Sequence, residues 1–94
     1  MTRTIHATRY KIFISDLIKA RKKANLTQQE VAQKLGRPQS YIAKIEGTER
    51  RLDIMEYIEI ACVLGINPAK PILHLTEIAA AETEQSLCRA KKNR

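Results

Sequence analysis

Aromatic residues, cysteines and long apolar runs are scarce in this sequence, and each shortage excludes a class of protein. Only 4% of the 94 residues are aromatic and none is tryptophan, so a core must be built mainly from Leu, Ile, Val and Ala, which suits packed helices. The two cysteines, Cys62 and Cys88, do not make a disulfide framework or a four-ligand metal site. No apolar run reaches the roughly 18 residues of a membrane span, and the basic N-terminus lacks the apolar stretch of a secretory signal. We therefore expect one small cytoplasmic domain with free thiols and no membrane partner.

The sequence also lacks the residue groupings that catalysis and metal binding require. It has no phosphate-binding glycine loop, no paired carboxylates with a cleft to hold them and no Cys–His constellation. His6 and His74 have no ligand partners at metal spacing. We therefore expect no enzyme activity, no cofactor and no metal site.

Acidic residues are outnumbered, and the imbalance is uneven along the chain. Ten Asp and Glu stand against 17 Lys and Arg, which gives a formal net charge of +7. Residues 1–24 contain seven basic residues and one acidic residue, whereas residues 52–77 contain one basic and four acidic residues. Such a one-sided basic charge favours a polyanionic partner, either nucleic acid or an acidic membrane surface.

Apolar spacing predicts helices along the chain and no convincing strand. In the first helix, from about residue 10 to residue 24, the inward face has helical spacing. Its members are Phe13, Leu17, Ala20 and Ala24. A last helix is expected to begin after the Asn67–Pro68 pair, which suits a helix cap followed by a first-turn proline, and to continue past Ile78.

Two capping boxes mark the starts of further helices. Thr27 and Glu30 form one in the stretch LTQQEV, and Asp53 and Glu56 form the other in LDIMEY. The helix after the second box is expected to end at Gly65. Its predicted inward residues are Ile54, Tyr57, Ile58, Ala61 and Leu64. A surplus of apolar residues is left outside that stripe: Met55, Ile60, Cys62 and Val63.

The stretch LGRPQSYIAKIEG ends one short helix and starts another at once. Gly36 is a natural helix stop, and Pro38 is tolerated at the start of a helix. The small side chain of Ala32 lets two helices cross closely. The spacing therefore predicts a helix-turn-helix, with the turn at 36–38 and the second helix at about 38–46.

The second of these helices has an apolar side and a polar side. Ile42 and Ile45 are the expected inward anchors. The side facing away is small, polar and basic, and comprises Ser40, Ala43 and Lys44, flanked by Gln39 and Tyr41. Glu46 is the only acid on that side and lies at its end.

These residues resemble the helix-turn-helix of the lambda-repressor and Cro type, also called XRE-like. The matching positions are Gln28, Ala32, Gly36, Ile42, Ile45 and Glu46. The likeness covers about Ile12 to Pro68, and it departs from the family pattern at Pro38, where many members have a Ser or Thr cap. It implies an all-α fold, a compact four- to five-helix bundle of the lambda-repressor-like type with a C-terminal helical extension.

The resemblance also implies roles for individual residues in DNA binding. By matching position, Gln39, Ser40 and Lys44 contact base edges, while Gln28 grips a phosphate and braces Gln39. Glutamine can pair with adenine through two hydrogen bonds, and lysine can reach guanine acceptors, so the chemistry agrees. Further contacts to the DNA backbone are expected from Arg37, Tyr41, Arg50 and Arg51. For Arg51, an ion pair with Asp53 or Glu56 is the alternative.

The expected organisation is a flexible basic arm at residues 1–9, a helix-turn-helix DNA-binding domain at residues 10–68 and a C-terminal helix with a basic tail at residues 69–94. The last segment is a candidate for dimerisation or partner binding. The function expected is that of a sequence-specific, double-stranded-DNA-binding transcriptional regulator, repressor-like and homodimeric. Two alternatives stay open: an adaptor that binds proteins on the same scaffold, and an antitoxin-type module that binds DNA and a partner protein. The operator, the regulated genes and the sign of regulation stay open as well.

Overall fold

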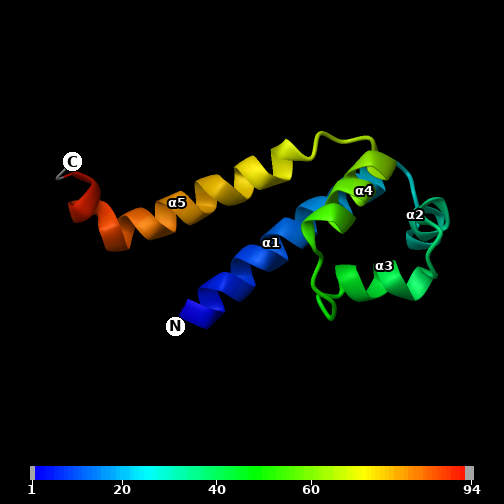
Figure 1. The fold of residues 1–94 in the computed structure, drawn as a ribbon, viewed down its shortest axis with the longest axis horizontal. Coiled ribbons are helices and arrows are strands. Elements are labelled where there is room, and N and C mark those ends of the chain that lie inside the picture. Colours follow the sequence, from blue (N-terminus) through cyan, green and yellow to red (C-terminus); the bar gives the residue numbers. More distant parts are fainter. Residues whose placement is uncertain (1, 93–94) are drawn as a thin grey trace.

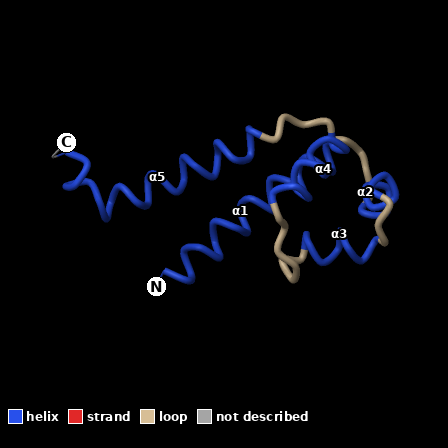
Figure 2. The backbone as a smooth tube through the Cα atoms, in the orientation of Figure 1, coloured by secondary structure: helices blue, strands red, loops and turns tan. Residues whose placement is uncertain are grey.

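The computed structural model describes residues 2–92, with side chains placed for residues 8–82, and in that range it contains helices and no strand. The helices are α1 (Thr2–Lys23), α2 (Gln28–Leu35), α3 (Gln39–Glu46), α4 (Ile54–Leu64) and α5 (Ala69–Lys92). Figure 1 shows α2, α3 and α4 gathered around the C-terminal half of α1, while α5 returns alongside α1. Only short loops join α1 to α2 and α2 to α3 (Figure 2). The predicted all-α fold is confirmed.

Both predicted capping boxes are present and set where α2 and α4 begin. The Thr27 hydroxyl accepts from the Glu30 N–H at 3.0 Å, and the Glu30 carboxylate accepts from the Thr27 N–H at 2.8 Å. Asp53 and Glu56 repeat this exchange at 2.8 and 3.1 Å. Each box satisfies N–H groups that a helix start otherwise leaves unpaired, so these short helices begin at defined residues.

The core lies where the C-terminal half of α1 meets α2, α3 and α4. Its buried side chains are Phe13, Ile14, Leu17, Val31, Ala32, Tyr41, Ile42, Ile45, Tyr57, Ile60, Ala61 and Leu64. The single phenylalanine packs against Tyr57 with 5.0 Å between ring centroids. The Tyr57 hydroxyl donates to the carbonyl of Pro68, which ties the loop before α5 to the core.

The predicted inward stripe of α4 is partly wrong. Tyr57, Ala61 and Leu64 are buried as expected, but Ile54 is 61% exposed, Ile58 is 38% exposed and Ile60 is buried. The helix is apolar on nearly every side, so its orientation depends on its neighbours. It packs on α1 and α2, whereas α5 packs on α1 and, within the described residues, not on α4. The C-terminal helix therefore does not cover the outer apolar face of α4.

The predicted flexible arm at residues 1–9 is helical from Thr2 onward and forms the first turns of α1. Helix α1 packs against α5, which fills the predicted C-terminal segment as far as Lys92. Two contacts join the helices: an ion pair of Arg9 with Glu82 at 2.6 Å, and a hydrogen bond between the His74 Nδ1 and the Asp16 carboxylate at 2.7 Å. The helix signal is weak here because the first turn of α1 contains no acidic residue to favour a start.

Candidate nucleic-acid interface

The turn between α2 and α3 depends on the backbone of Gly36. This residue has φ +70°, a left-handed conformation that L side chains rarely adopt, and its N–H bonds to the last carbonyls of α2. Nothing lies within 4 Å of the place that a Cβ would take, so the constraint is the backbone angle and not lack of space. The Arg37 N–H then bonds to the Ala32 carbonyl at 2.9 Å, which completes the helix stop. The predicted helix-turn-helix is therefore built as a rigid corner.

The start of α3 has an unusual cap. Pro38 occupies the N-cap position with an extended backbone and supplies no side-chain hydrogen bond. A Ser or Thr there would accept from one of the first N–H groups of the helix. The first turn of α3 therefore presents N–H groups that no cap side chain satisfies, beside the exposed side chains of Gln39 and Ser40. Such a helix end attracts an anion.

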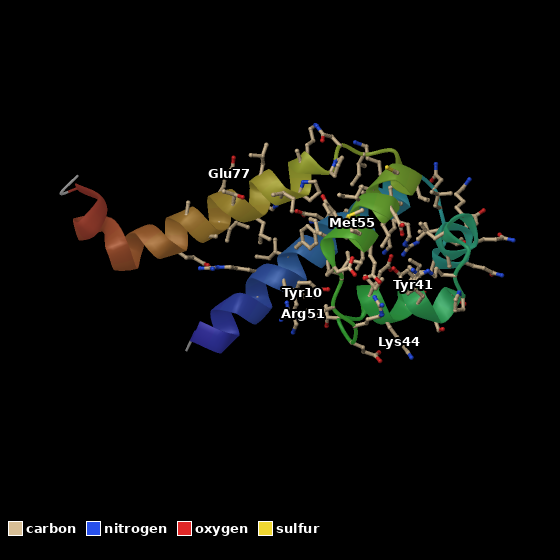
Figure 3. All side chains as sticks on the ribbon, viewed as in Figure 1. Tyr10, Tyr41, Lys44, Arg51, Met55 and Glu77 are labelled. Carbon is tan, nitrogen blue, oxygen red and sulfur yellow. The ribbon has the colours of Figure 1, made fainter. Side chains whose placement is uncertain are left out.

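The amide groups of Gln28 and Gln39 form a hydrogen bond at this corner, as the family resemblance implies. The Gln39 Nε2 donates to the Gln28 Oε1 at 3.1 Å, linking the first residue of α2 to the first residue of α3. Gln39, Ser40 and Lys44 are all exposed. Lys44 projects from α3 away from the rest of the fold (Figure 3). The three predicted base-contacting residues thus share one open edge.

A hydrogen-bonded ion pair lies directly behind the amide pair. Glu46, at the end of α3, accepts from the Arg21 Nε at 2.7 Å and from its Nη2 at 3.1 Å, and it also accepts from the Gln28 Nε2 at 2.9 Å. Both charged side chains are little exposed, 13% for Arg21 and 12% for Glu46. Glu46 therefore does not lie on the exposed face of α3, contrary to expectation. Arg21 was missed because its partner is 25 residues away, and helical spacing only relates residues within a few turns.

Tyr41 lies in the core, with 8% of its surface exposed, and does not flank the open face of α3 as expected. Its ring lies between two guanidinium groups, with the Arg37 Cζ 4.5 Å and the Arg50 Cζ 4.9 Å from the ring centroid. Burial and the neighbouring Glu56 carboxylate raise the pKa of the Tyr41 hydroxyl. The inward face of α3 is therefore Tyr41, Ile42 and Ile45, which are adjacent on a helix. The ring orients two arginines and has little surface left for a phosphate.

Arg50 forms the ion pair that was considered for Arg51. Its two terminal nitrogens each lie 2.9 Å from a different Glu56 oxygen. These hydrogen bonds lower the pKa of Glu56 to about 2, and the hydrogen bond from the Asp53 backbone N–H is the next largest cause. Arg51 instead stacks on Tyr10, with its Cζ 4.4 Å from the ring centroid (Figure 3). The hydroxyl of Tyr10 accepts from the Leu52 N–H at 3.1 Å, so α1 fixes the loop that carries both arginines.

Comparison with known proteins agrees with this geometry. Residues 17–70, more than half of the chain, match the helix-turn-helix family. The chain belongs to the XRE-like helix-turn-helix family. A solved structure described as an XRE-family like protein from Pseudomonas syringae pv. tomato str. DC3000 is 40% identical and superposes with a TM-score of 0.78, over 82% of this chain and 94% of that one. No curated protein matches the sequence.

Membership of this family makes the chain a DNA-binding regulator, with double-stranded DNA as its ligand. The family is one of DNA-binding regulators. Among the described residues, no helix is both long enough and apolar enough to cross a bilayer. The α2–α3 corner lies within the matched residues and carries the hydrogen-bonded amide pair of Gln28 and Gln39.

Proposed function

We propose that this XRE-like protein is a sequence-specific transcriptional regulator that inserts the start of α3 into the major groove of DNA. The observation that carries the proposal is the Gln28–Gln39 amide pair at the open corner of α2 and α3, with Ser40 and Lys44 exposed on the same edge. An amide has both a donor and an acceptor, so it can distinguish base edges, whereas a bare cation detects only negative charge. The edge therefore has the chemistry for direct recognition of base sequence.

The groups around this edge suit contact with phosphates. Gln28 lies at the N-terminus of α2, where backbone N–H groups and the helix dipole favour an anion. Arg37 and Arg51 are exposed and each is steadied by an aromatic ring, which limits the entropy lost on binding. The guanidinium of Arg50 already pairs with Glu56, so we assign it a smaller share of phosphate binding. We assign Tyr41 an indirect role, in which its ring orients Arg37.

We further propose that two copies bind DNA as a two-fold dimer. One recognition helix contacts only a few base pairs, and a dimer doubles the contact with half-sites about 34 Å apart. The candidate interface is the uncovered apolar surface of α4 and α5, whose large exposed residues are Ile54, Met55, Ile58, Ile72 and Leu73. Exposed Cys62 and half-buried Val63, both in the predicted apolar surplus, also lie on α4, whereas Ile60 is buried and takes no part. The candidate dimerisation segment at residues 69–94 extends beyond the residues whose side chains are described.

Selection of bound duplexes from a random DNA pool tests both proposals at once. Recovery of one preferred sequence with inverted symmetry is the expected result. Sedimentation of wild type, Met55→Lys and the control Gln33→Lys, which adds the same charge on α2 outside the apolar surface, locates the interface. We expect Met55→Lys alone to shift the protein toward monomer. A wild type that is monomeric both free and on DNA contradicts the dimer, and a pool without enrichment contradicts sequence recognition.

The same apolar surface favours one second candidate, an antitoxin-type module in which a different protein covers α4 and α5. Met55 on α4 is 63% exposed and Leu73 on α5 is 58% exposed, and large exposed apolar side chains of this kind mark protein contacts when they gather. A partner that copurifies with the wild type and is lost from Met55→Lys supports this candidate. Binding to heparin or to random DNA separates both DNA-binding candidates from a pure adaptor, which binds neither.

A further inference from the structure

A continuous chain of hydrogen bonds links the core to the amide that faces the DNA. It starts at Arg21 on α1, which donates twice to Glu46 at the end of α3. Glu46 accepts at 2.9 Å from Gln28, at the start of α2, and Gln28 accepts at 3.1 Å from Gln39, at the start of α3. The charged end is almost enclosed, while Gln39 is exposed. The chain therefore runs from a fixed point inside the fold to a side chain at its surface.

The chemistry of Glu46 determines which group donates and which accepts in each of these hydrogen bonds. A carboxylate paired with a guanidinium can only accept hydrogen bonds, so Gln28 must turn its NH₂ group toward Glu46. The Gln28 oxygen is then the atom that faces Gln39, and Gln39 must donate one N–H to it. Gln39 keeps its oxygen and its second N–H for another partner. An acceptor beside a donor is therefore fixed before any DNA arrives.

We infer that Glu46 is a positioning residue for base recognition, which sets the amide orientation of Gln39 through Gln28 and thereby favours adenine. The major-groove edge of adenine presents the N6 donor beside the N7 acceptor, which matches the oxygen and the free N–H of Gln39. Guanine presents two acceptors in the same places, so the Gln39 oxygen has no partner there. This inference rests on the proposed function, in which Gln39 contacts a base.

The same contacts explain why Gln28 alone does not provide this control. An amide can present either its oxygen or its NH₂ group to a neighbour, and an amide pair without an outside partner can adopt both arrangements. Glu46 removes one of them, because its oxygens repel the oxygen of Gln28. Loss of that freedom before binding is preorganisation, which improves discrimination without adding a contact to DNA.

The test compares affinities of variants for two duplexes that differ at one base pair. That pair is the one at which Gln39→Ala loses its preference, and it is either A·T or G·C. For the wild type we expect about tenfold or greater discrimination in favour of A·T, as one bidentate contact provides. Glu46→Gln keeps the shape of the side chain but can donate as well as accept, so we expect the discrimination to fall by at least about threefold. Melting by circular dichroism sets a temperature at which every variant is folded.

A second substitution separates positioning from general destabilisation. Gln28→Met has nearly the same shape, leaves the Arg21–Glu46 pair intact and interrupts the chain in its middle. We expect it to lower the discrimination as Glu46→Gln does, and we expect the double variant to lower it no further, since both act through one path. Phe13→Leu is the control for lost core packing, because Phe13 packs against Tyr57 away from the amide pair.

The outcomes distinguish the inference from the function on which it rests. A wild type that binds both duplexes equally, at every position tested, overturns base recognition by Gln39 and the role of Glu46 with it. A wild type that discriminates, together with a Glu46→Gln variant within about twofold of it, overturns the role of Glu46 alone. Additive effects of Glu46→Gln and Gln28→Met, or an equal loss in Phe13→Leu, also overturn it, because the effect then follows stability.

Discussion

The inward face of α3 is apolar and buried, whereas its outward face is polar and open to solvent. Tyr41, Ile42 and Ile45 are 8%, 2% and 2% exposed and pack into the core. Gln39 and Lys44, on the same eight-residue helix, are exposed. The apolar face holds the helix in the core, whereas the open face contributes one exposed hydrogen bond, from Gln39 to Gln28. The difference indicates that stability and recognition are separable in this helix.

The two faces are nevertheless joined at one point. Glu46 ends α3 on the buried side, yet through Gln28 it reaches Gln39 on the open side. A helix of eight residues is too short to be stable alone, so its orientation comes from packing. Glu46, which joins the two faces, is therefore expected to affect both properties, whereas an apolar anchor affects stability and a residue on the open face affects recognition.

The largest effect is expected from Ile45→Ala. The change removes a buried anchor between α1 and α3 and leaves a cavity, which costs roughly 2–5 kcal/mol of folding stability. Because the open face is untouched, the affinity of the fraction that remains folded should keep its sequence preference. Thermal or urea unfolding measures the first effect, and binding below the melting temperature measures the second. If Ile45→Ala is as stable as the wild type, the assigned orientation of α3 is wrong.

The next effect is expected from Gln39→Ala, on binding and not on folding. Loss of a base contact costs on the order of 1–3 kcal/mol on the preferred duplex and relaxes the preference at one base pair. Gln39 is exposed in the free protein, so folding stability should change by less than about 0.5 kcal/mol. Titration of preferred and scrambled duplexes separates the two. If the variant unfolds, or loses affinity equally for both duplexes, the inward and outward faces of α3 are assigned the wrong way round.

Local signals explain how much of this comparison the sequence could predict. Thr27 with Glu30 and Asp53 with Glu56 are only three residues apart, so both helix starts could be identified and both are present. Gly36 marked the corner for the same reason, and the contact between Gln28 and Gln39 followed from the family resemblance. Features fixed by neighbours in sequence, or by a family pattern, were accessible.

Features fixed by distant partners were not accessible. The orientation of α4 depends on α1 and α2 covering one side and α5 leaving the other bare, so Ile58 and Ile60 were assigned to the wrong faces. Tyr41 was placed at the edge of the open face because spacing alone does not reveal the two arginines that enclose its ring. Arg9 on α1 pairs with Glu82 on α5, 73 residues away, and a basic sequence gives no local sign of that contact.

A smaller, pH-dependent effect on folding stability is expected from the ion pair between Arg50 and Glu56. The pKa of Glu56 is about 2 in the folded protein, mainly because of its hydrogen bonds from Arg50, and 4.5 is its ordinary value. A carboxyl group with a lowered pKa stabilises the fold above its ordinary pKa, and that stabilisation is lost as pH falls toward the folded value. Glu56→Gln should therefore melt below wild type at pH 7, and the two melting temperatures should converge between pH 4.5 and about 2. A gap as large at pH 2 as at pH 7 contradicts the ion pair as its cause.

The smallest effect is expected from Arg51→Ala, at the rim of the open side. Arg51 stacks on Tyr10 and is exposed, so its loss removes one guanidinium from the surface and nothing from the core. If it neutralises one phosphate, log affinity plotted against log salt becomes shallower by about 0.9, equally for preferred and scrambled duplexes. Arg50→Ala is the matched comparison: its guanidinium pairs with Glu56, so we expect a smaller change in slope together with a lower melting temperature. Equal slopes for wild type and Arg51→Ala remove this residue from the interface. A loss confined to the preferred duplex makes it a base contact, which extends sequence recognition beyond the open face of α3.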